Sequence, residues 1–122
     1  MSKKNPVPVS INLHKKSRIL EIEYDNGNHF EFSCEFLRVY SPSADVKGHG
    51  PGQGVLQTGK ENVSIENIEQ VGNYAIKLLF DDGHQTGIYS WSYLYDLGVN
   101  MDHYWQDYLD ALRDAGYTRN IT

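Results

Sequence analysis

The sequence predicts an α+β domain made of two copies of a β-hairpin followed by a short helix, with an added C-terminal helix. Residues 22–37 and 78–94 each contain an apolar strand, an Asp-Asx-Gly turn, a second strand, a serine and an aromatic–leucine stretch. An amphipathic segment near the C-terminus predicts the added helix. A chain of 122 residues fits one domain.

The first copy is expected after a flexible N-terminus, residues 1–8. Apolar and polar residues alternate along 9–13 and 20–24, as in half-buried strands. The turn at 25–27 ends in glycine and predicts a hairpin, and Ser33 predicts the N-cap of the helix. The second strand is expected to bury Leu20, Ile22 and Tyr24 and to expose Glu21 and Glu23.

The second copy repeats this order. Residues 74–80 form the strongest strand pattern in the chain, and Asp81, Asp82 and Gly83 predict its turn. Ser90 predicts a second N-cap, and Gly98 is expected to end the helix. Residues 9–98 thus form the predicted domain.

The C-terminal region, residues 99–122, predicts a helix over 101–115. Asn100 or Asp102 lies at its expected start, and Gly116 follows its end. We expect one helical face to pack on the sheet of the same domain, with a partner groove as the alternative. That face carries Trp105, Tyr108, Leu109 and Leu112.

Composition excludes several function classes. The net charge of −5 disfavours nucleic acid and anionic membranes as partners. No window approaches the ~20 apolar residues of a membrane span, and the N-terminus lacks the apolar region of a signal peptide. The single cysteine, Cys34, suits a reducing cytoplasm and is expected to be a small buried residue, since no partner identifies it as a nucleophile.

Residues 41–60 form a predicted loop, in which five of the eleven glycines lie between positions 48 and 59. Its backbone N–H groups can approach an anion, but the phosphate-binding Lys-Ser/Thr ending is missing. The alternative, which we favour, is a surface loop whose glycines allow close packing.

His84 follows Asp81, Asp82 and Gly83, at the tip of the second hairpin. An imidazole there can bind a metal, although a solvent-exposed turn histidine explains the pattern as well. No Ser-His-Asp triad, facing pair of acidic catalytic residues or H-E-x-x-H motif can be argued from the sequence, so we expect no enzymatic activity.

Several blocks of the chain together resemble the gamma-butyrobetaine hydroxylase-like N-terminal domain family, long catalogued as a domain of unknown function. The blocks are LRVYSPSA at 37–44 with GHG at 48–50, VGNYA at 71–75, FDDGH at 80–84, TGIYSW at 86–91, and YL at 93–94. In longer relatives this domain precedes a 2-oxoglutarate- and iron-dependent dioxygenase domain. We expect the present chain to lack that domain and its hydroxylase activity.

The resemblance also implies a zinc site of three cysteines and one histidine in those relatives. The cysteine segment corresponds to residues 41–46 here, where all three thiolates are missing, whereas His84 matches the histidine. Neutral hydroxyls are poor zinc ligands beside thiolates, so a structural zinc site is not expected. Asp45, His49 and His84 offer a harder site for iron or zinc instead.

The combined expectation is a noncatalytic accessory or protein-interaction module with an unidentified protein partner. Relatives fused to P-loop proteins that deliver iron–sulfur clusters suggest a link to iron or iron–sulfur metabolism. The alternative is a protein that holds iron or zinc through His84 and its neighbours. We expect a monomer or weak homodimer. The expected interaction surface comprises Ser41, Ser43, Gly48, His49, Gly50, Gly52 and Gln53.

Overall fold

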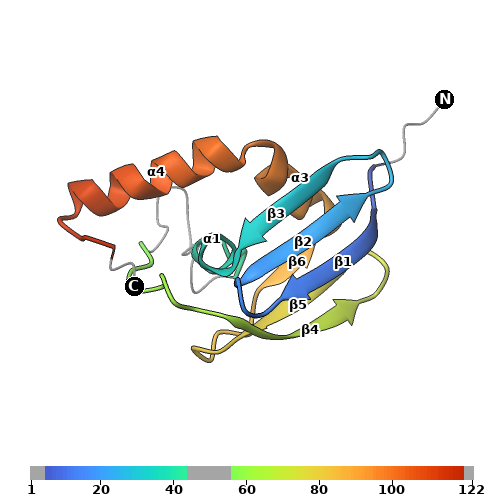
Figure 1. Cartoon of the computed structure of the whole chain (residues 1–122), viewed down its shortest axis with the longest axis horizontal. Coiled ribbons are helices and arrows are strands. Elements are labelled where there is room, and N and C mark those ends of the chain that lie inside the picture. Colours follow the sequence, from blue (N-terminus) through green and yellow to red (C-terminus); the bar gives the residue numbers. More distant parts are fainter. Residues whose placement is uncertain (1–4, 44–55, 120–122) are drawn as a thin grey trace.

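The computed structural model describes residues 5–43 and 56–119, and this part of the chain forms two three-stranded antiparallel sheets and three helices. The α+β class predicted from the sequence is confirmed. Each sheet keeps its strands in chain order, and Figure 1 shows the first sheet lying over the second, with the helices beside them. In chain order the elements are β1 (Pro8–His14), β2 (Ile19–Tyr24), β3 (His29–Ser33), α1 (Cys34–Val39), β4 (Ile65–Val71), β5 (Ala75–Phe80), β6 (Ile88–Ser90), α3 (Trp91–Val99) and α4 (Met101–Asp114).

The two hairpin turns have the same geometry, as the duplication predicts. Gly27 and Gly83 both adopt φ of 90°, a conformation that side chains rarely allow. The Gly27 N–H donates to Tyr24 O over 3.0 Å, and the Gly83 N–H donates to Phe80 O over 3.2 Å. The duplication is therefore visible in backbone hydrogen bonds as well as in residue types.

Both predicted serine caps are confirmed. The Ser33 hydroxyl accepts the Phe36 N–H at 3.0 Å, and the Ser90 hydroxyl accepts the Tyr93 N–H at 3.1 Å. Each cap satisfies a backbone donor that the first helical turn leaves without a partner. Because each serine ends a strand, the chain turns directly from the sheet into the helix.

One core joins the two units. Leu20 and Ile22 from the first sheet and Leu78 from the second are fully buried in the same cluster. Two buried tyrosines link the units reciprocally. The Tyr24 hydroxyl donates to Trp91 O in α3 over 2.8 Å, and the Tyr89 hydroxyl of β6 donates to Leu37 O in α1 over 2.5 Å.

The expectation that Gly98 ends the second helix is wrong. Gly98 lies inside α3, which continues to Val99. A Cβ at position 98 would lie 2.5 Å from Cγ of Phe30, on β3. The glycine is therefore required for contact between helix and sheet, and its place near the helix end is incidental.

The C-terminal helix packs on the domain, but not flat on a sheet as expected. Tyr108 and Leu112 are each 4% exposed and cluster with Val39 at the end of α1 and with Leu56. Figure 1 shows α4 extending past α1, away from the sheets. The apolar stripe of α4 meets α1, where Trp105 also contacts the ring of Phe36. None of the described helices has the length and apolar character needed to cross a membrane.

Candidate functional site

Buried polar side chains are concentrated in one short stretch. Among the described residues, the buried polar or charged ones are Glu35, Arg38, Ser41 and Ser43, all in α1 or directly after it. Burial of a polar group is costly unless hydrogen bonds replace those to water. Such a concentration marks a built network, and its partners identify the candidate site.

The two buried serines of this stretch contact His84, in the turn after β5. His84 Nε2 lies 2.8 Å from Ser41 Oγ and 3.4 Å from Ser43 Oγ. The backbone reinforces the arrangement, because the Ser43 N–H donates to Ser41 Oγ over 3.4 Å and the His84 N–H donates to Asp82 Oδ1 over 3.1 Å. The imidazole is thereby held against both hydroxyls.

Gly87 makes this approach possible, and sequence reasoning missed its role. A Cβ at this position would overlap Ser41 Oγ and lie 3.2 Å from the Tyr89 ring. No positive φ is involved at Gly87, so the requirement is purely one of space. The only sequence signal is a glycine where residues 86–89 return as a strand, which indicates close approach of another segment.

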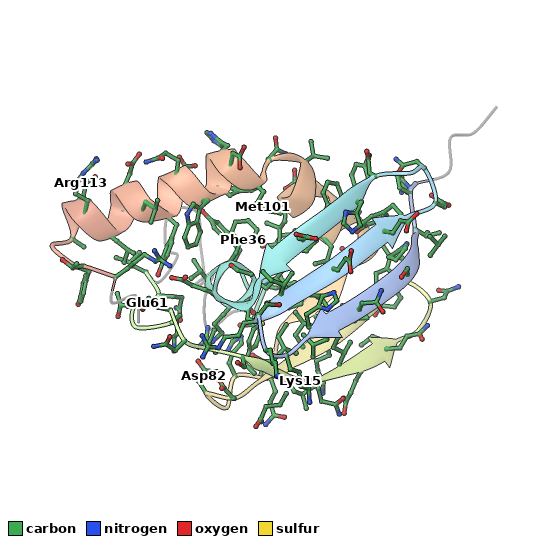
Figure 2. All side chains as sticks on the ribbon, viewed as in Figure 1. Lys15, Phe36, Glu61, Asp82, Met101 and Arg113 are labelled. Atoms are coloured by element: carbon green, nitrogen blue, oxygen red, sulfur yellow. The ribbon has the colours of Figure 1, made fainter. Side chains whose placement is uncertain are left out.

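An ion-pair network lies beside the serine–histidine contact. Arg38 Nε and Lys60 Nζ each lie 2.9 Å from Asp82 Oδ2, and Arg38 Nη1 donates to Gln57 Oε1 over 3.1 Å. Figure 2 labels Asp82 on the side of the molecule below α1, with side-chain nitrogens next to it. Burial raises the pKa of Asp82, but hydrogen bonds from Lys60, the His84 N–H and Arg38 outweigh it and lower this pKa to about 2.

Both described flanks of the glycine-rich segment therefore meet the same turn. Ser41 and Ser43, before the segment, contact His84, and Lys60, after it, contacts Asp82. The Tyr108 hydroxyl adds a third support, because it donates to Gln57 O over 2.8 Å. The two flanks are separated by residues 44–55 in sequence, but both contact the same turn in space.

Three of the predicted site residues come together, namely Ser41, Ser43 and His84. The two serines differ from the expectation that they lie on an interaction surface, since they are 1% and 8% exposed. Their hydroxyls are used to hold His84. The remaining predicted residues, Asp45, Gly48, His49, Gly50, Gly52 and Gln53, lie outside the described part of the chain.

The donor set around His84 does not fit a thiolate zinc site. Two serine hydroxyls contact Nε2, and neutral hydroxyls are weak zinc ligands. Cys34 cannot substitute, because it is 1% exposed within the core cluster, as predicted, and burial raises the pKa of its thiol. Within the described ranges, His84 does not belong to any group of three potential metal ligands.

Comparison with known proteins identifies the family. Residues 11–95 match the family described as "Gamma-butyrobetaine hydroxylase-like, N-terminal". The chain belongs to this family. The resemblance noted in its sequence blocks is thus confirmed, and the match runs from within β1 into α3 and includes Ser41, Ser43 and His84. No curated protein matches the chain.

Solved structures of other proteins share the fold of this chain. Two proteins with NMR solution structures are 54% and 47% identical, each with a TM-score of 0.81. The alignments cover 98% and 94% of this chain and 90% of each relative. A protein of unknown function from Acidithiobacillus ferrooxidans, assigned to the DUF971 family, is 37% identical, with a TM-score of 0.64 over 75% of this chain and 91% of its own.

Proposed function

We propose that this family member is a noncatalytic, cytoplasmic protein-interaction module that presents residues 44–55 to a protein partner. The observation that carries the proposal is the anchoring of both flanks of this segment to the turn at Asp82 and His84. Functional loops are typically displayed from rigid scaffolds, and this network supplies such a scaffold. A monomer or weak homodimer suits this role.

The sequence of the segment supports recognition through the backbone. Positions 48, 50, 52 and 54 are glycines, and His49 and Gln53 are interspersed with them. Glycines leave main-chain N–H and C=O groups accessible to a partner at close range. The buried Ser41 and Ser43 then serve as positioning residues, while the partner contacts the segment between the two flanks.

The serine–histidine pair supports a noncatalytic role. A separation of 2.8 Å between Ser41 Oγ and His84 Nε2 is within the range of a nucleophile and its base. However, Ser41 is 1% exposed and its Oγ also accepts the Ser43 N–H. A substrate therefore has almost no access to the hydroxyl, and the pair acts as a structural clasp.

Site-specific photo-crosslinking tests the interaction in the native host. A photoreactive amino acid replaces His49 in one variant and His103, which is exposed on α4, in the control. We expect one dominant protein adduct from position 49 that is absent from position 103 and reduced by His84→Ala. Absence of a specific adduct at position 49, or the same adducts at both positions, would refute the proposal.

We also infer a link to iron or iron–sulfur metabolism from the family resemblance. The identity of the crosslinked partner tests this link, and we expect an iron or iron–sulfur protein.

The competing hypothesis is an iron or zinc site formed by Asp45, His49 and His84. Isothermal titration with Fe²⁺ and Zn²⁺ separates the two, because binding that disappears in His84→Ala favours the metal site.

A further inference from the structure

The solvent-exposed face of the first sheet carries a second cluster of chemically active side chains. Glu21 on β2 pairs directly with Glu31 on β3, and His29 lies two residues from Glu31 on the same face. His14, at the end of β1, approaches Glu21 from the other side. Because side chains alternate along a strand, the pleat of one three-stranded sheet aims all four groups at solvent.

Short contacts between side chains bring these groups together. The two carboxylate oxygens of Glu21 face different imidazoles, with Oε2 at His29 Nε2 and Oε1 2.9 Å from His14 Nε2. One ligand atom from each of Glu21, His29 and Glu31 lies within 4.8 Å of the others. Among the described residues, these three form the only such group of potential metal ligands.

We propose that Glu21, His29 and Glu31 bind a divalent first-row transition-metal ion such as Zn²⁺, with His14 as the positioning residue. His29 supplies an imidazole nitrogen, and the two glutamates supply carboxylate oxygens. His14 holds the second oxygen of Glu21, as outer hydrogen-bond partners of metal-binding carboxylates commonly do. Water completes the coordination, since His29 and Glu31 are exposed.

The geometry requires only small adjustments. Zinc–nitrogen and zinc–oxygen bonds of about 2.1 Å place tetrahedral ligand atoms ~3.4 Å apart. Atoms that already lie within 4.8 Å reach this spacing by rotation of exposed side chains, without movement of the strands. The backbone pairing between Glu21 and Glu31 keeps their Cβ atoms at a fixed separation.

Charge gives an independent reason for a cation at this position. Like charges directly opposite each other on neighbouring strands destabilise a sheet. In the described ranges, neither Glu21 nor Glu31 forms an ion pair with a lysine or arginine. Glu21 already contacts His14 and His29, and a divalent ion adds positive charge beside the cross-strand carboxylate pair, so its binding is coupled to relief of repulsion.

This cluster is separate from the turn at His84, so a failure of the metal site proposed here does not affect the function proposed for that turn. Titration calorimetry of the full chain with ZnCl₂ alone tests for zinc binding at either place. We expect one ion per chain, with His29→Ala and Glu31→Gln each weakening binding about tenfold or more and His14→Ala weakening it less. His84→Ala and the control His103→Ala should leave affinity within about twofold, because His103 contacts a single carboxylate, on Asp107.

Thermal melting gives a readout that does not depend on heat of binding. Zn²⁺ should raise the melting temperature of the wild type but not of Glu31→Gln. In EDTA, Glu31→Gln should be at least as stable as the wild type, because it removes the repulsion at Glu21. The proposal is overturned if Zn²⁺ does not bind at about 1 mM, or if His29→Ala and Glu31→Gln bind it as the wild type does. Loss of binding in His84→Ala alone would assign the ion to the other site.

Discussion

Replacement of Gly87 by alanine tests whether close approach at the turn holds the serine–histidine clasp together. A Cβ at position 87 overlaps Ser41 Oγ and also lies close to the Tyr89 ring, at 3.2 Å. Ser41 must therefore shift, and its 2.8 Å contact with His84 Nε2 breaks. Backbone strain does not contribute, since Gly87 is not among the residues with positive φ.

The expected cost combines two effects. Overpacking a close contact by one methyl group costs ~1–3 kcal/mol. A buried hydroxyl that loses its partner costs ~1–3 kcal/mol, and Ser41 is 1% exposed. Side-chain rotation relieves part of the overlap, so we expect Gly87→Ala to lower the free energy of unfolding by ~2–4 kcal/mol. For a chain of this length, that corresponds to a decrease of roughly 10 °C in melting temperature.

A double-mutant cycle with Ser41→Ala isolates the contact. Ser41→Ala removes the overlapping oxygen, so the double variant should be about as stable as Ser41→Ala alone. Urea unfolding monitored by tryptophan fluorescence gives the four free energies. The reasoning is refuted if Gly87→Ala melts within about 2 °C of the wild type, or if the two single costs add in the double variant.

Three further changes test other parts of the structure. The folded pKa of Asp82 is about 2, below its unfolded value of ~3.9, so its stabilising effect is present above pH ~4 and is lost as the pH falls towards 2. Over this interval, the urea midpoint of the wild type should decrease more than that of Asp82→Asn. Equal decreases would contradict this role of Asp82. Arg119→Ala removes the ion pair with Glu35, which is 6% exposed, and should lower the free energy of unfolding by ~2–4 kcal/mol. Thermal melting should show this loss, with partial recovery in Arg119→Lys. An unchanged melting temperature would mean that the Glu35 carboxylate does not depend on Arg119. Gly98→Ala should destabilise by ~1–3 kcal/mol because the Cβ meets Phe30, although alanine normally stabilises a helix; a higher melting temperature would disprove the close contact.

Sequence reasoning predicted those parts of the fold that depend on neighbouring residues. The turns at Gly27 and Gly83 and the caps at Ser33 and Ser90 follow from a residue's own φ preference or a hydrogen bond three residues away. The family blocks also placed Ser41 and Ser43 opposite His84, which the structure bears out by direct contact. The roles of Gly87 and Gly98 were missed because each depends on a side chain distant in sequence.

Duplication, strand alternation, turn positions and helix caps were available from residue order alone, because each depends on local dihedral angles and short-range hydrogen bonds. Tertiary packing decided that the stripe of α4 meets α1, that Phe30 occupies the space beside Gly98, and that Ser41 is buried. It also brought Glu21, His29 and Glu31 together on one face. These outcomes depend on which surfaces remain uncovered when the two units pack, and no local sequence pattern predicts that.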